Sequence, residues 1–286
     1  MASEAIDIAV KAADKLRRDW RAGNRPGRIL FELANRKNML VFRFAMASKL
    51  SGLFVHSIRD KASLILINTT NKNVYHQRFT LAHELGHSQL HQDQGLIIDL
   101  DEGRQDDPRD HEANIFAAQL LVPLKELTQV LGAYRVKAAD VTVRLIVELA
   151  RMFGVSHEVI LWRIKVIGQL PQEEIGRRIE DTDWDAAWRR FAPDAHSNTL
   201  CTERPPIWHP EGVSSETARQ ISGLPAVYRE MAFEAYQRRK ITAGKLADIL
   251  GLSGSSVVLD ELAPLIALDQ QESVASLENI QESGGE

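Results

Sequence analysis

The chain has 286 residues, of which 44% are hydrophobic and 26% charged, and its formal net charge is -4 at pH 7. This length is typical of about two domains, and the apolar content is sufficient for real hydrophobic cores. No apolar run approaches the roughly 20 residues of a membrane-spanning helix, and the single cysteine, Cys201, excludes an internal disulfide. We therefore predict a folded cytoplasmic protein with no membrane partner.

The first twenty residues predict an amphipathic helix. Ile6, Val10, Ala13, Leu16 and Trp20 recur at helical spacing among charged residues. A signal peptide requires a continuous apolar stretch instead, so we do not expect this segment to be one.

Three segments that follow predict a small antiparallel sheet. Residues 39–44, 52–58 and 63–69 are rich in β-branched and aromatic side chains. The polar segment 59–62 is short enough to be a hairpin turn between the last two. An exposed edge of such a sheet can bind an extended peptide as an additional strand, through main-chain hydrogen bonds.

The most informative motif in the chain is HELGH, which runs from His83 to His87. Residues i and i+4 lie on the same face of a helix, so both imidazoles can bind one metal ion while Glu84 lies beside it. This arrangement suits metal-assisted hydrolysis, in which zinc activates a water molecule and Glu84 accepts its proton. The alternative is an ordinary helix with two surface histidines, which fits the apolar residues around them poorly.

The residues around the motif, 79–91, predict a buried helix with Thr80 as its N-cap. They contain no proline, and apolar side chains cover most of the helix circumference. Gly86 weakens a helix by about 1 kcal/mol relative to alanine, so we expect a neighbouring backbone to approach closely there.

A zinc site with two histidines needs a third protein ligand. The extended motif would place a histidine six residues after His87, but Asp93 stands there. His91 lies too far along the same helix to complete a tetrahedral site. We expect His91 on the surface, or otherwise beside the ligands rather than among them.

Residues 107–123 predict a second helix, with an acidic cap, a proline at its first position and a proline at its end. Glu112 lies on the apolar stripe of this helix, and a buried carboxylate needs a partner such as a metal ion. Glu112 is therefore our candidate for the third ligand, with the alternative that it is a solvated glutamate stabilised by the helix dipole. Asp110 and His111 point elsewhere on the helical wheel, and His111 is the reserve candidate.

The two helices together resemble those of the ImmA/IrrE metallopeptidases. The hallmarks of that family are an HExGH helix and a later helix with Glu-Ala-Asn-x-Phe-Ala-x-x-Leu-Leu-x-Pro, which correspond here to residues 83–87 and 112–123. The resemblance covers about residues 30–170. It implies an α+β fold with a zincin-like core and a gluzincin-like site, in which His83, His87 and Glu112 bind Zn²⁺ and Glu84 is the catalytic base.

The resemblance also implies a regulatory function. Family members are known for cleaving helix-turn-helix transcriptional repressors, which relieves repression during stress or the induction of mobile elements. We therefore expect a zinc-dependent endopeptidase with such a repressor as its protein substrate. The alternative is a regulator in a toxin–antitoxin-like system that binds its partner without cutting it. The presence of Glu84 favours the enzyme, because a pure binding protein has no need of the base.

A short internal repeat follows the peptidase motifs. Residues 149–156 and 246–253 each predict a helix, a glycine turn and the start of a second helix. These second helices begin without the arginines or lysines that contacts to DNA require, so we expect packing or substrate recognition rather than direct binding of nucleic acid. By resemblance, the first copy belongs to the family's helical module.

These features divide the chain into four parts. The zincin-like metallopeptidase core spans residues 1–125, a helical HTH-like module spans 126–170, and a helical C-terminal extension spans 171–262. Residues 263–286 are polar and acidic, which predicts a disordered tail. Eight of the 39 acidic residues and none of the 35 basic ones follow Lys245, so the preceding part has 35 - 31 = +4, too small a charge for a nucleic-acid surface.

Overall fold

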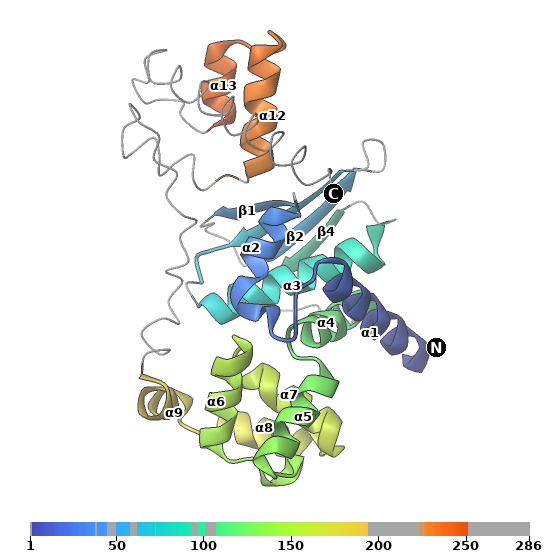
Figure 1. The fold of residues 1–286 in the computed structure, drawn as a ribbon, viewed down its shortest axis with the longest axis vertical. Coiled ribbons are helices and arrows are strands. Elements are labelled where there is room, and N and C mark those ends of the chain that lie inside the picture. The colour runs from blue at the N-terminus through green and yellow to red at the C-terminus, as the bar shows by residue number, and fades with distance from the viewer. Residues whose placement is uncertain are drawn as a thin grey trace, which may run out of the picture. The chain divides into compact units, whose positions relative to one another are not determined.

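A computed structural model describes residues 2–37, 39–44, 50–57, 62–71, 73–92, 96–100, 107–193, 224 and 226–250. The contacts within the chain divide it into two units, residues 1–203 and residues 204–286. The first unit contains a sheet and the helices around it (Figure 1), and the described residues of the second form two helices. Cys201 and the predicted tail, 263–286, lie outside the described residues.

The N-terminal helix is present as predicted. α1 (Ala2–Asp19) buries Ala9, Ala13 and Leu16 and packs against α4 (Pro108–Leu121). A short 3-10 turn (Pro26–Ile29) and α2 (Leu30–Arg36) then lead into the sheet. The helix therefore contributes to the core that supports α4.

The sheet has four strands in the order β1-β3-β2-β4. β3 lies between β1 and β2, pairing in parallel with β1 and antiparallel with β2. β2 also pairs antiparallel with β4, which leaves β1 and β4 at the two edges. The strands are β1 (Leu40–Phe44), β2 (Leu50–Ser57), β3 (Ala62–Asn68) and β4 (Leu96–Leu100).

The prediction of a wholly antiparallel sheet is wrong for β1. The consecutive strands β1 and β2 are not neighbours, because β3 is inserted between them, and β1 therefore runs in the same direction as β3. The antiparallel pairing of β2 with β3 agrees with the prediction, although residues 59–61 of the expected turn lie outside the described part of the chain. β4 has no counterpart among the predicted strands.

The HELGH motif lies in α3 (Val74–Leu90), which is buried as predicted. Thirteen of its 17 residues are buried, because α3 packs against β2 and β3 on one side and against α4 on another (Figure 1). The predicted N-cap is wrong. Asn73 caps the helix by accepting from the backbone N–H groups of Tyr75 and His76, whereas Thr80 lies inside it and donates its hydroxyl to the carbonyl of His76. The part of the helix before Thr80 buries polar side chains, such as Gln77 and Arg78. A search for apolar periodicity therefore misses it.

α3 and α4 approach each other closely at Gly86, which agrees with the predicted role of this glycine. A Cβ atom at Gly86 would lie 3.0 Å from the Cα of Ala113 and 3.2 Å from its carbonyl oxygen. The backbone of α4 thus occupies the space that a side chain would need. This contact sets the distance between the helix that carries both histidines and the helix that carries the candidate carboxylates.

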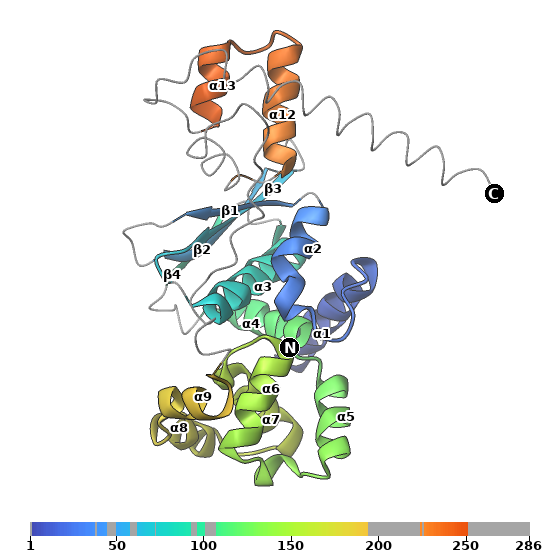
Figure 2. The same cartoon turned by 60° about the vertical axis from the view of Figure 1, so that its left-hand side comes forward.

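Within the described residues of the first unit, five α-helices follow α4 (Figure 2). The predicted glycine turn of residues 149–156 is present, since Gly154 has a left-handed φ of 72° and Ser156 caps the next helix. Thr242 similarly caps a helix in the second unit, but residues 251–253 of the second copy lie outside the described residues. The helices are α5 (Leu124–Tyr134), α6 (Val143–Phe153), α7 (His157–Gly168), α8 (Gln172–Glu180), α9 (Trp184–Phe191), α12 (Ala226–Gln237) and α13 (Ala243–Ile249).

Across the described ranges, no helix combines the length and the apolar character that crossing a membrane would require.

The contact at Gly86 predicts a large difference between two glycine substitutions. Gly86→Val forces a branched side chain against Ala113, so it should lower the free energy of unfolding by about 1–3 kcal/mol. Gly176→Ala, in the middle of α8, meets nothing within 4 Å and should raise it by up to about 1 kcal/mol. Urea unfolding followed by circular dichroism measures both. Equal effects of the two substitutions would contradict the close approach.

Candidate metal centre

The two motif histidines face one carboxylate of α4. Nε2 of His87 lies 3.0 Å from Nε2 of His83 and 3.9 Å from Oδ1 of Asp110. Each of the three side chains offers one ligand atom, and these atoms all lie within 4.8 Å of one another. Both histidines are buried and Asp110 is partly buried. Within the described residues, this is the group of histidine and carboxylate side chains that is close enough to hold a metal ion.

A hydrogen bond to α4 decides which nitrogen of His83 faces this site. Nδ1 of His83 lies 2.9 Å from Oδ1 of Asn114. The amide oxygen is an acceptor, so Nδ1 of His83 carries the proton, and the Nε2 of the neutral ring keeps a lone pair. Asn114 therefore orients His83 with its lone pair toward His87.

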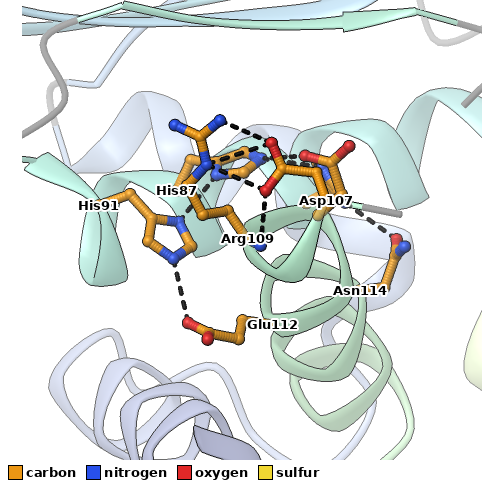
Figure 3. A network of polar contacts seen from close by, with 8 residues as sticks. His87, His91, Asp107, Arg109, Glu112 and Asn114 are labelled. Atoms are coloured by element: carbon orange, nitrogen blue, oxygen red, sulfur yellow. Dashed lines mark hydrogen bonds and ion pairs between the residues drawn. The ribbon is translucent and has the colours of Figure 1, made fainter. Parts of the chain in front are cut away.

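His91 and Glu112 orient His87 in the same way, through two consecutive hydrogen bonds (Figure 3). Nδ1 of His87 lies 2.9 Å from Nδ1 of His91, and Nε2 of His91 lies 3.1 Å from Oε2 of Glu112. The carboxylate accepts, so His91 donates from Nε2, and its Nδ1 accepts the proton of His87 Nδ1. His87 is thereby fixed with the lone pair of its Nε2 facing His83.

The residues present fit a metal ion. Two lone pairs that face each other across 3.0 Å repel unless a metal ion or a proton lies between them. Atoms that bind one zinc ion tetrahedrally at 2.0–2.1 Å lie about 3.3–3.4 Å apart. This value falls between the 3.0 Å and 3.9 Å separations of the candidate ligands. Two imidazoles and one carboxylate are also a known donor set of catalytic zinc sites, in which the fourth position stays open.

Glu84 lies on the same helix and is fully buried against β2. A Cβ atom at Gly52 would overlap Oε1 of Glu84 and would lie 2.8 Å from Cγ2 of Thr80. The absence of a side chain at Gly52 thus makes room for the carboxylate. Sequence reasoning missed this role, because a glycine at the start of a predicted strand has no feature that separates it from an ordinary one.

The predicted geometry of the second helix is wrong in one respect. Asp110 was expected to point away from the histidines, but it lies beside His87. α4 packs against α3 and also against α1, where Gln119 bonds Asp14, so its buried residues cover two faces of the helix. The helical wheel shows the buried residues of both faces as one apolar stripe. Glu112 lies on that stripe and Asp110 does not, so the sequence favoured Glu112 as the third ligand.

The other predicted residues have definite positions as well. Glu112 contacts His91, as described above, and its role as a metal ligand stays a prediction. His91 is buried, with 7% of its surface exposed, so the expectation of a surface residue is wrong, and it contacts His87 instead. His111 is exposed and lies on the wall of a neighbouring cavity, away from the group of His83, His87 and Asp110.

The first turn of α4, which carries Asp110, is held by its own cap as predicted. Asp107 accepts from the backbone N–H of Arg109 at 2.9 Å, and the Arg109 side chain returns to Asp107 at 2.6 Å (Figure 3). Pro108 occupies the first helical position, where a backbone N–H has no partner in the helix. This double contact restrains the turn from which Asp110 projects.

Residues 34–165 match the family model of peptidase family M78, the IrrE N-terminal-like domain. This match assigns residues 34–165 to the ImmA/IrrE family. The matched segment contains the sheet, α3, α4 and most of α7, and thus the whole candidate metal centre. No curated protein matches the chain. Membership of a peptidase family agrees with a buried group of histidines and a carboxylate that is compatible with a metal site.

The geometry separates the roles of the two carboxylates on α4. Asp110→Ala removes the carboxylate that lies beside His87 and should abolish stoichiometric zinc binding. Glu112→Ala removes the second of the two hydrogen bonds that orient His87 and should lower the zinc affinity by about 10–100-fold. Competition with a fluorescent chelator measures both affinities, with Asp19→Ala on the exposed end of α1 as the control. The reverse order of the two effects would show that Glu112 is the ligand.

Proposed function

We propose that this chain is a zinc-dependent endopeptidase that cleaves a helix-turn-helix transcriptional repressor in the cytoplasm. Cleavage would relieve repression in a stress or mobile-element response. The observation that carries the enzymatic part is the convergence of His83, His87 and Asp110, with both Nε2 lone pairs facing one point. The family supports a peptidase. The choice of a repressor as substrate rests on the family resemblance.

The ligand set that we propose is His83, His87 and Asp110, in place of the set with Glu112. Asp110 is the carboxylate that lies within reach of the histidine pair, whereas Glu112 supports His87 through His91. A zinc ion bound by these residues would lower the pKa of a water molecule and polarise the carbonyl of the scissile bond. Asn114 and His91 keep the two imidazoles in the tautomers that this binding requires.

Glu84 performs the proton transfers in the proposed mechanism. Its carboxylate accepts a proton from the attacking water and then delivers it to the nitrogen of the leaving amine. Gly52 and Thr80 limit the space in which this carboxylate can lie. Glu84 follows His83 directly on α3, and this helix is held between the sheet and α4. The distance from the base to the proposed ligands is therefore fixed.

Substitution of the base tests the proposal. Wild-type protein with zinc, mixed with the repressor encoded beside its gene, should cut that repressor into two fragments, and a chelator should prevent this. Glu84→Gln should bind zinc as wild type does, because it leaves all three ligands in place, and should cut about 10²–10⁴-fold more slowly. Gel electrophoresis and mass spectrometry measure the cleavage.

Two outcomes would contradict the proposal. Full activity of Glu84→Gln would remove Glu84 from the chemistry. A stable complex of wild-type protein with an uncut repressor would favour the alternative, a regulator that binds its partner without cleaving it.

The position of Gly52 generates a separate prediction. Gly52→Val places a side chain where the Glu84 carboxylate lies, so cleavage should fall by about 100-fold through displacement of the base. The zinc affinity should stay within a few-fold of wild type, because the atoms nearest a Cβ at Gly52 belong to Glu84 and Thr80 and not to a proposed ligand. Paired measurements of cleavage and zinc affinity check this, and thermal unfolding controls for the fold. If Gly52→Val loses zinc binding as well as activity, Gly52 supports the metal site instead.

A further inference from the structure

A cavity of about 1030 Å³ lies in the first unit, beside the candidate metal centre. It is bounded by α3 and α4 on one side and by α7, α8 and α9 on the other. This volume is at the upper end of the range for ligand sites in proteins. Five large aromatic side chains line it, namely Tyr75, Phe79, Trp162, Trp184 and Trp188.

Contacts among the lining residues hold part of this aromatic wall in place. The ring of His157 stacks on Trp184 with a centroid distance of 4.1 Å and an interplanar angle of 13°. The indole N–H of Trp188 donates to Nδ1 of His157 at 3.2 Å, and Trp188 lies 5.5 Å from the ring of Tyr75. These residues come from α3, α7 and α9, so the wall is preformed by the packing of three helices. A preformed wall reduces the entropy lost when a ligand binds.

His157 also provides a polar group on this wall. Burial lowers its pKa to about 4, so the ring is neutral at pH 7. Its Nδ1 accepts from Trp188, and its proton therefore lies on Nε2. In the part of the chain that the structure describes, this N–H has no hydrogen-bond partner. It can donate to a carbonyl group of an occupant.

The charges on the wall argue against a phosphate-bearing ligand. Lys165 lies over the ring of Trp162 at 5.0 Å, and the Arg163 guanidinium donates to Gln119 and to the carbonyl of Val122. The acidic side chains Glu158 and Asp185 line the same cavity. Charges of both signs are thus present among the lining residues, without the concentrated positive charge that phosphates favour.

The cavity connects to the metal centre through Asn114. This residue lines the cavity, and its Oδ1 lies 2.9 Å from Nδ1 of His83. His76 and Phe79, which also line the cavity, precede His83 on α3 by seven and four residues, or about two turns and one turn of helix. An occupant of the cavity therefore lies close to the residues that would hold the scissile bond.

We propose that this cavity recognises the protein substrate by binding bulky aromatic or aliphatic side chains of the segment next to the scissile bond. This inference rests on the proposed function. The apolar surface of the cavity reaches the outside of the protein along α7, since 40% of Trp162 and 53% of Val166 are exposed. A protein segment covers such a rim together with the cavity, and buried aromatic anchors supply most of the affinity in peptide recognition.

A binding experiment without catalysis tests the inference. Zinc-free Glu84→Gln protein is immobilised and incubated with a library of acetylated nonapeptides whose residues are randomised, and the retained peptides are sequenced by mass spectrometry. They should be enriched in Phe, Trp, Leu or Ile at one or two positions. A fluorescein-labelled copy of the best peptide then gives the dissociation constant by fluorescence anisotropy.

Two substitutions with equal exposure provide the comparison. Val166→Asp puts a charge on the rim of the cavity and should weaken the best peptide at least tenfold. Ile8→Asp, on α1, is the matched control, because Ile8 is also 53% exposed but does not line the cavity, and it should leave the affinity unchanged. An unchanged affinity of Val166→Asp would overturn the inference.

Two further results separate this inference from other possibilities. Binding of N-acetyl-tryptophanamide as tightly as the best peptide would identify a small-molecule site and overturn it. If the retained peptides are enriched in aromatic or aliphatic residues but wild-type protein cleaves no substrate, the proposed function fails and the recognition site stands. If wild-type protein cleaves its substrate and Val166→Asp cleaves it equally well, the recognition site fails alone.

Discussion

The close packing of α3 against α4 is the constraint on which the candidate site depends. With no side chain at Gly86, the backbone of α4 at Ala113 lies in contact with the helix that carries both histidines. At this separation, Asp110 lies beside His87 one turn before Ala113, and Asn114 reaches His83 directly after it. A bulkier residue at position 86 would move all of these contacts together, because they belong to two rigid helices.

Hydrogen bonds to the two histidines then determine which of their nitrogen atoms can bind a metal ion. A neutral imidazole can present a lone pair from either nitrogen, and the partner of the other nitrogen decides which one. Asn114 makes this choice for His83, and Glu112 makes it for His87 through His91. Both choices direct lone pairs into the same 3.0 Å gap, an arrangement that is unfavourable without a cation and favourable with one. The polar groups behind the histidines therefore prepare the site for a metal ion.

Much of this arrangement could be predicted from the sequence, and the failures have physical causes. The spacing of HELGH and the cap at Asp107 follow from local geometry, which one segment determines by itself. Gly86 weakens its own helix, which predicts a close approach there but does not identify the partner helix. The position of Asp110 beside His87 depends on which elements cover each face of α4, and no property of α4 alone reveals that it is packed on two sides. The parallel pairing of β1 with β3 was missed for the same reason, because the sequence of a strand does not identify its partner.

The position of the cavity suggests how one family can share a reaction and differ in its targets. All of the proposed ligands and the base lie within residues 34–165, which the family model matches. The cavity wall extends further, since Gln172, Trp184 and Trp188 lie in α8 and α9, beyond the matched segment. Trp188 and Trp184 hold His157 of α7 in place, so residues outside the family segment shape a surface that begins inside it. Changes in α8 and α9 would therefore alter which protein the proposed recognition site binds, without disturbing α3 and α4, which carry the proposed catalytic residues.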